Sequence, residues 1–255
     1  MRVAAVQFRG DRADLDGRRA ALARWVWGAG PGTDVVVCPE LAVSGYVFED
    51  PTDAGRVAEA PTGPTFQALA PVARALGTFV VCGFVERDQD RLFNSAMVID
   101  PAGELAFVYR KTLLYELDEH WATPGDSGYA TFVTDRGDFT VGICMDLNDP
   151  GMIGFVERSA PRVLAFPTNW LEEGSDVWTY WAWRMDTTRT ALVAANTWGE
   201  ERGVAFSGRS AILQRRERTG GRRWWVLAAG EQTGDALLHA ELDAPRPTPA
   251  DLVSS

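Results

Sequence analysis

Three side chains with complementary chemistry each follow an apolar run of this sequence. Cys144 ends the run 141–144, Glu40 comes two residues after the run 35–38, and Lys111 follows the run 105–109. A thiol attacks a carbonyl carbon once it has lost its proton, a carboxylate can take that proton, and an ammonium group can stabilise the resulting oxyanion. Together the three residue types predict nucleophilic catalysis that needs no histidine.

Each of the three residues, taken alone, also has a purely structural interpretation. Cys144 can be a buried core cysteine, Glu40 an exposed loop carboxylate and Lys111 a solvated lysine. All three, however, follow predicted strands, and open α/β sheets place their ligand-binding crevice at the carboxyl ends of strands. Their joint placement therefore favours one site.

The elements expected to position these residues alternate between strands and helices. Helices are predicted around 15–26 and over 64–76 and 176–189, with Thr62 a possible N-cap and Gly77 a possible C-cap of the second. Because the pattern recurs in both halves, it predicts an α/β core of two sheets with helices outside. Strands are predicted at 3–8, 34–38, 78–85, 95–100, 104–109, 130–134, 139–143, 163–166, 192–195, 210–213, 224–227 and 236–241.

Composition excludes several classes of protein. The 255 residues carry a formal net charge of −10, which disfavours nucleic acid as a partner, and 46% of them are hydrophobic, which indicates a folded chain. We expect one domain over 1–244 and a C-terminal tail over 245–255. The longest apolar run, 79–85, is too short for a membrane span, and no signal peptide is evident, so we expect a soluble cytoplasmic protein. Three scattered cysteines and two histidines predict neither disulfides nor a metal, and we expect no cofactor.

Four segments, taken in order, resemble one known family. In this order the chain is similar to the nitrilase superfamily of carbon-nitrogen hydrolases, whose catalytic set is Glu-Lys-Cys. The resemblance implies Glu40 as general base, Lys111 as stabiliser of the tetrahedral oxyanion and Cys144 as nucleophile, with the backbone amide of Met145 as second oxyanion donor. The segments are CPELAVSGY at 38–46, YRKT at 109–112, VGICMDL at 141–147 and FPTNW at 166–170.

The same resemblance implies a fold and a reaction. The fold is a four-layer α-β-β-α sandwich, which members of the family commonly assemble into homodimers. The reaction converts a small-molecule amide to a carboxylic acid plus ammonia or an amine, through a thioester on the cysteine. Nitrile and N-carbamoyl substrates use the same triad and stay open as alternatives. A catalytically silent binding protein on the same fold is the alternative from another class.

Members of the family often have a further glutamate after the lysine. Glu119, eight residues beyond Lys111, is the first candidate for this position, and Glu116 is its rival. Either can instead be a solvated loop acid.

The turn after the nucleophile departs from the common family pattern. Many members have Asp-Leu-Arg-Phe-Pro-Glu there, whereas this chain has Asn148 in place of the arginine, as in DLNDPG at 146–151. The arginine is a usual carboxylate clamp, so its absence predicts a neutral or amine-bearing substrate. The run GICMDLN at 142–148 is closer to the branch containing N-terminal amidases. The residues expected to bind substrate are Tyr46, Trp121, Met145, Asn169 and Trp170.

Overall fold

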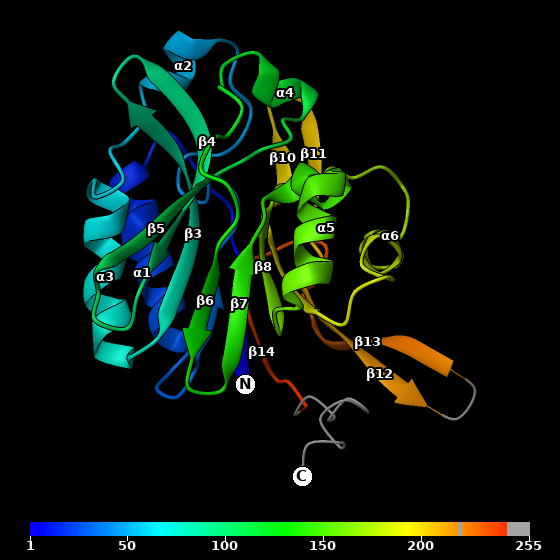
Figure 1. Ribbon diagram of the computed structural model, residues 1–255. Coiled ribbons are helices and arrows are strands. Elements are labelled where there is room, and N and C mark those ends of the chain that lie inside the picture. Colours follow the sequence, from blue (N-terminus) through cyan, green and yellow to red (C-terminus); the bar gives the residue numbers. More distant parts are fainter. Residues whose placement is uncertain (219–220, 244–255) are drawn as a thin grey trace.

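The computed structural model describes residues 1–218 and 221–243, so the predicted tail over 245–255 lies outside the described residues. Two six-stranded sheets pack against each other, and helices cover their outer surfaces (Figure 1). This arrangement confirms the predicted α-β-β-α sandwich. None of the helices in the described ranges combines the length and the apolar character that crossing a membrane requires.

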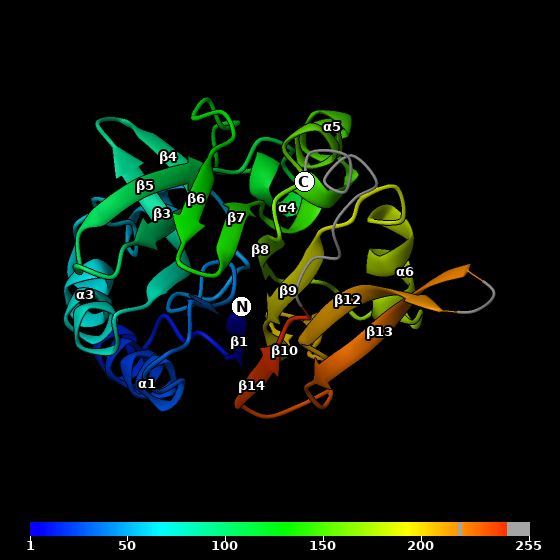
Figure 2. The ribbon, with the colours of Figure 1, turned by 60° about the horizontal axis from the view of Figure 1, so that its bottom comes forward.

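The first sheet has the strand order β14-β1-β2-β3-β4-β5. Strands β1, β2 and β3 are parallel, while β4, β5 and β14 pair antiparallel with their neighbours. Helices α1 (Leu15–Gly28) and α3 (Pro64–Leu76) cover its outer face (Figure 2). The strands are β1 (Arg2–Gln7), β2 (Val35–Val37), β3 (Phe79–Asp88), β4 (Arg91–Ile99), β5 (Leu105–Arg110) and β14 (Ala236–Glu241).

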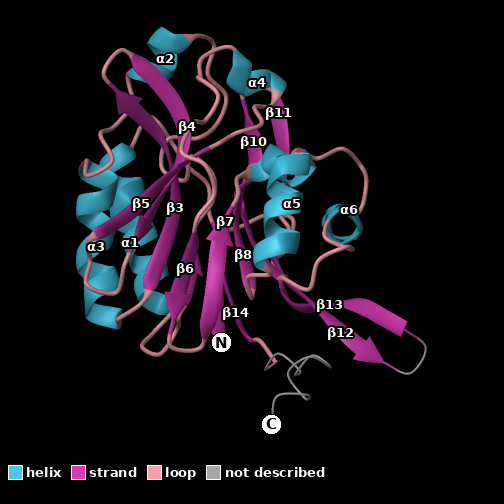
Figure 3. Cartoon of the chain, in the orientation of Figure 1, coloured by secondary structure: helices cyan, strands magenta, loops and turns pink. Residues whose placement is uncertain are grey.

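The second sheet has the order β13-β12-β9-β8-β7-β6, with β7, β8 and β9 parallel. Helices α5 (Pro150–Ser159) and α6 (Val177–Arg184) lie on its outer side (Figure 3). The strands are β6 (Thr131–Thr134), β7 (Gly137–Val141), β8 (Val163–Thr168), β9 (Ala191–Asn196), β12 (Ala211–Arg218) and β13 (Gly221–Ala229).

The continuous apolar runs of the sequence reflect strands that are covered on both faces. In β2, Val35 and Val37 belong to the apolar cluster between the sheets, whereas Val36 belongs to the cluster beneath α1 and α3. Successive side chains of a strand point to opposite faces, so a strand between two apolar layers needs an apolar residue at every position. The sandwich thus explains why the run 35–38 shows no alternation.

Most predicted elements appear within a few residues of their expected bounds, and two differences are informative. Helix α3 covers 64–76 as predicted and ends at Gly77 in the left-handed conformation (φ 63°), but its N-cap is Gly63, not Thr62, because Pro64 occupies the first helical turn. Helix α6 ends at Arg184, five residues before the predicted end.

Short elements gather at the carboxyl ends of the central parallel strands, at the top of Figure 1. Here the chain forms loops and single turns, so this edge carries the side chains that follow β2, β5, β7 and β8. The short elements are α2 (Pro51–Gly55), α4 (Glu116–Glu119), the 3-10 helix η1 (Cys144–Asn148), β10 (Trp198–Glu201) and β11 (Val204–Ser207).

Candidate active site

A buried ammonium group between two carboxylates forms the centre of the site. Lys111 follows β5, and its Nζ lies 2.7 Å from Oε1 of Glu40 and 2.5 Å from Oδ2 of Asp118. All three side chains are completely buried. Isolated charges are costly to bury, so each of these groups depends on its neighbours for stabilisation.

Glu40 is fixed by hydrogen bonds from three directions. Besides Lys111, the side-chain amide of Asn94 donates to its Oε1 (2.7 Å), and the backbone N–H of Asn169 donates to its Oε2 (2.8 Å). The Asn169 side chain also donates to the Glu40 carbonyl oxygen (2.9 Å). Gly83 allows the loop that carries Glu40 to lie close to β3, because a Cβ atom at Gly83 would lie 2.5 Å from the Glu40 Cα. The carboxylate is therefore held in one orientation.

Cys144 begins the 3-10 turn after β7, with its backbone in the left-handed region (φ 42°). Such a conformation is strained in a residue with a side chain and persists only where neighbouring contacts impose it. Asp146 supplies these contacts, because its buried carboxylate ties the turn to the segment after Lys111. It accepts hydrogen bonds from the backbone N–H groups of Ile143 (2.9 Å), Thr112 (3.0 Å) and Leu113 (2.8 Å) and from the hydroxyl of Tyr109 (2.8 Å).

The environment of the thiol disfavours its ionised form. Burial and the nearby charge of Glu40 raise the pKa of Cys144 to about 12, although Lys111, the Thr168 side chain and the Asn169 backbone oppose the rise. At neutral pH the resting thiol therefore keeps its proton. Nucleophilic attack requires a base beside it.

The same burial acts on the base and the cation. Burial raises the pKa of Glu40; Lys111 lowers it and Asp118 adds to the rise. For Lys111, burial acts to lower the pKa, but the charges of Asp118 and Glu40 outweigh it and the pKa is well above its usual value. Lys111 thus stays an ammonium ion, and Glu40 has more affinity for a proton than an exposed carboxylate.

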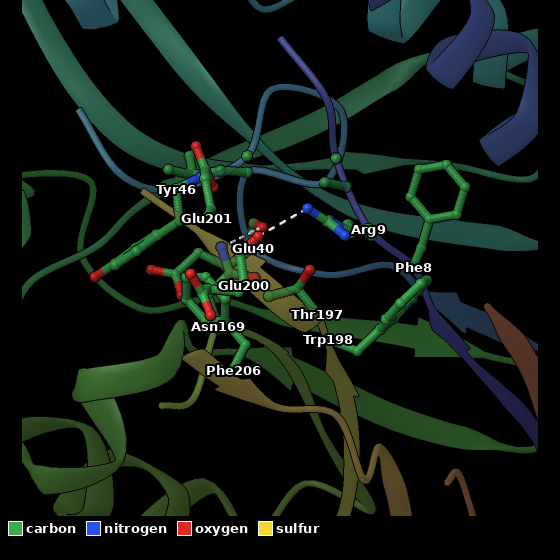
Figure 4. Close-up of a pocket in the computed structure, with 14 residues that line it drawn as sticks. Phe8, Arg9, Glu40, Tyr46, Asn169, Thr197, Trp198, Glu200, Glu201 and Phe206 are labelled. Carbon is green, nitrogen blue, oxygen red and sulfur yellow. Dashed lines mark hydrogen bonds between the residues drawn. The ribbon is translucent and has the colours of Figure 1, made fainter. Parts of the chain in front are cut away.

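Of the predicted substrate-binding residues, Tyr46 and Asn169 join this cluster. The Tyr46 ring is buried, with its centroid 5.8 Å from the Lys111 Nζ. Glu40, Tyr46 and Asn169 also line a pocket together with residues of β10 and β11 (Figure 4).

The side chains of the other predicted substrate-binding residues contact residues outside this cluster. Trp170 is half-buried, and its ring centroid lies 5.3 Å from that of Tyr180 and 5.9 Å from that of Trp181, both on α6. Trp121 is buried against Phe48, 5.3 Å between centroids. Met145 is the second residue of the 3-10 turn that Cys144 begins, and its sulfur accepts a hydrogen bond from the Asn148 side chain (3.3 Å).

The acid that contacts Lys111 from α4 is Asp118, and the expectation for Glu119 or Glu116 is corrected here. Both glutamates are exposed, whereas Asp118 is completely buried. Helix α4 is a single turn in which Glu116 and Glu119 lie on one face, whereas Asp118 points in a different direction, toward the lysine. The sequence held a usable signal: Asp118 is the third residue of the helix and accepts from the backbone N–H of Tyr115 (3.1 Å), as helix-start acids often do.

Comparisons with known proteins agree with this geometry. The carbon-nitrogen hydrolase family matches residues 2–219. A nitrilase of Pyrococcus abyssi is 33% identical over 215 residues, covering 83% of this chain and 78% of the relative. A protein N-terminal amidase of Schizosaccharomyces pombe is 25% identical over 223 residues, 71% of this chain and 78% of the relative. An amidase from Nesterenkonia sp. AN1, solved with acrylamide added to its active-site cysteine, has the same fold, with a TM-score of 0.80, 20% identity and coverage of 96% and 94%.

Proposed function

Because the chain belongs to the carbon-nitrogen hydrolase family, we propose that it hydrolyses an amide through a thioester on Cys144, with Glu40 as base and Lys111 as oxyanion stabiliser. The chain is a thiol-dependent carbon-nitrogen hydrolase, and the proposal concerns the substrate and the role of each residue. The observation that carries it is the buried contact of Lys111 with Glu40, beside a cysteine held in a strained turn.

In the first half of the reaction, Glu40 removes the thiol proton as the sulfur attacks the amide carbon. The pKa values of the Cys144 thiol and of Glu40 are both raised. Transfer of the proton to Glu40 during the attack is therefore favoured over formation of a thiolate before the attack. The carbonyl oxygen becomes an oxyanion that the Lys111 ammonium and the Met145 backbone N–H stabilise. The C–N bond then breaks, and the proton on Glu40 passes to the departing ammonia or amine.

In the second half, water attacks the thioester and Glu40 accepts one of its protons. A second oxyanion forms at the same place and collapses with cleavage of the C–S bond. The proton returns from Glu40 to the sulfur, which restores the thiol and releases the carboxylic acid. Lys111 keeps its proton throughout, consistent with its strongly raised pKa.

The test of this proposal compares two buried cysteines. Cys144→Ala should abolish ammonia release from a panel of amides, because no nucleophile is left. Cys82→Ala should keep it, since Cys82 is a core residue beneath α1 and α3. Full activity in the Cys144→Ala protein would overturn the assignment. Nitriles and N-carbamoyl compounds belong in the same panel, because the similarity to the Pyrococcus abyssi nitrilase favours a nitrile as second candidate.

We infer further that the substrate is neutral or carries an amine, not a free carboxylate near the scissile bond. Asn148 brings no charge to the turn, and its side-chain oxygen accepts a hydrogen bond from Tyr180 (2.6 Å). The likeness to a protein N-terminal amidase supports testing amides at the N-terminal end of a peptide.

Two arginines, Arg184 and Arg189, are the alternatives for a carboxylate clamp. Arg184 donates from its Nε to the Leu147 carbonyl (3.0 Å), its guanidinium lies 5.3 Å from the Trp183 ring, and Arg189 is exposed. Two amides of equal length, one ending in a carboxylate and one in an amine, test the inference. A strong kcat/KM preference for the carboxylate would contradict it and implicate Arg184.

Assembly as a homodimer and a cytoplasmic location are part of this proposal. Trp183 on α6 is 63% exposed, and large exposed aromatic side chains are enriched where proteins associate. Sedimentation of the purified protein with and without Trp183→Ser tests the dimer, which should weaken in the variant if α6 lies in the interface.

A further inference from the structure

The hydroxyl of Thr168 is a buried polar group that the reaction described above does not use. Thr168 is the last residue of β8 and is completely buried. Within the described residues its Oγ1 has no hydrogen-bond partner of ordinary geometry. A buried hydroxyl without a partner costs folding free energy, so such a group calls for an explanation at the site where it lies.

Thr168 lies beside the nucleophile because of the register of two parallel strands. Val141 of β7 pairs with Ala165 of β8, and Cys144 and Thr168 each lie three residues further along their own chains. The next residue, Asn169, donates its backbone N–H to Glu40 (2.8 Å). The end of β8 therefore adjoins both the thiol and its base.

The geometry points to Thr168 as an additional catalytic residue, whose hydroxyl donates a hydrogen bond to the Cys144 sulfur when that sulfur carries negative charge. This inference rests on the proposed function, in which the sulfur is charged twice: as Glu40 takes its proton, and as the C–S bond of the thioester breaks. Thr168 keeps its own proton in both steps. In the thioester the sulfur is uncharged and this hydrogen bond is weak.

The electrostatics of the thiol agree with this role. Burial and Glu40 raise the pKa of Cys144, while the Thr168 side chain is among the groups that lower it. A hydrogen-bond donor that stabilises the charged form of the sulfur lowers the pKa of the thiol in this way. Since the thiolate forms only during the reaction, the benefit falls on the reaction path and not on substrate binding.

The experiment measures the alkylation of the thiol by iodoacetamide, so it does not depend on knowing the natural substrate. The Thr168→Val variant keeps the shape of the side chain and removes the donor, whereas Thr168→Ser keeps the donor. We expect the alkylation rate of Cys144, followed by mass spectrometry between pH 7 and 9, to fall about tenfold in Thr168→Val. Thr168→Ser should stay within about twofold of the unmodified protein. Cys144→Ala gives the background labelling.

The outcomes separate this inference from the proposed function. If Cys144 of the unmodified protein does not react above background, the proposed nucleophile is wrong. If Cys144 reacts normally and the folded Thr168→Val protein reacts equally fast, the role of Thr168 is wrong. Equal losses in the Val and Ser variants would show a packing effect and also overturn it. Should Thr168→Val fail to fold, Thr168→Ala against Thr168→Ser makes the same comparison.

Discussion

Two ionic clusters of this protein hold a carboxylate in different surroundings. In the inner cluster, one cation, Lys111, contacts the carboxylates of Glu40 and Asp118, and all three side chains are fully buried. In the outer cluster, the carboxylate of Asp53 contacts Arg12 (3.1 Å) and Arg202 (2.7 Å), and each of these arginines also contacts another carboxylate. The side chains of these arginines are 21% and 37% exposed.

The two clusters shift carboxylate pKa values in opposite directions. For Asp53, burial acts to raise the pKa, but the hydrogen bonds and charges of Arg202 and Arg12 outweigh it and the pKa is lowered. For Glu40, burial together with Asp118 outweighs Lys111 and the pKa is raised. Two arginines beside one carboxylate near solvent make a stable structural tie. An excess of carboxylates in the interior keeps a base that can bind a proton.

Removing the cation of the inner cluster should have the largest effect. We expect Lys111→Ala to lower kcat by about 10²- to 10³-fold with little change in KM, because the oxyanion exists only on the reaction path. Steady-state kinetics on the best amide of the panel measures this.

The outer cluster provides the matched control for the loss of a cation. Arg202→Ala removes one cation from Asp53 but touches no reacting group, so kcat should stay within about twofold. An effect of Lys111→Ala on KM alone would mean that the lysine binds substrate in the ground state and does not stabilise the oxyanion.

Two neighbouring acids on α4 test the second carboxylate of the inner cluster. Asp118→Asn removes a charge that lies 2.5 Å from the Lys111 Nζ, whereas Glu119→Gln alters an exposed side chain one residue away. We expect kcat to fall on the order of tenfold in the first variant, because the lysine loses one of the groups that hold it in place. The second variant should be unchanged. The reverse ranking would restore Glu119 as the functional acid.

This pair of acids also shows where inference from the sequence ends. Glu40, Lys111 and Cys144 follow apolar strands of the two facing sheets, and the carboxyl ends of these strands lie at the same edge of the sandwich, so the sequence was sufficient to group them. Asp118 and Glu119 differ only in the direction in which a one-turn helix points their side chains. The helix-start position of Asp118 is a signal in the sequence, but whether its side chain reaches Lys111 depends on tertiary contacts, which no periodicity in four residues encodes.

Other parts of the fold were missed for local reasons. Helix α5 was not predicted, although Asp149 and Pro150 are typical of a helix start and the Asp149 carboxylate accepts from the backbone N–H of Gly151 and Met152. The left-handed backbone of Cys144 has no sequence signal, since strain of this kind depends on the four donors that hold Asp146. Strands covered on both faces were the most predictable elements, because burial requires apolar residues throughout.

The pH dependence of activity sharpens the contrast between the clusters. Glu40 must be ionised to act as base, so kcat/KM should increase with pH as Glu40 loses its proton. Because the pKa of Glu40 is raised, this acidic limb of the pH profile should lie above the usual glutamate range. Asp118 contributes to the rise. We therefore expect Asp118→Asn to move the limb to lower pH. Asp53→Asn should leave the limb in place, and a limb that stays fixed in Asp118→Asn would show that the two carboxylates do not interact.

The smallest expected effect concerns the outer cluster, which should contribute to stability and not to rate. Asp53→Asn should lower the free energy of unfolding by about 1 kcal/mol at neutral pH, with kcat unchanged. Because the pKa of Asp53 is lowered on folding, its contribution is present above the unfolded-state value of about 3.9 and is lost as the pH falls through the folded-state value. The difference in the free energy of unfolding between the two proteins, measured by urea unfolding, should thus stay constant from about pH 8 to 5 and shrink below about pH 4.

This difference in the free energy of unfolding should also decrease in about 0.5 M salt, because both arginines are partly exposed. A difference that grew with acidity would mean that Asp53 is stabilised as the neutral acid, and the two clusters would then be alike.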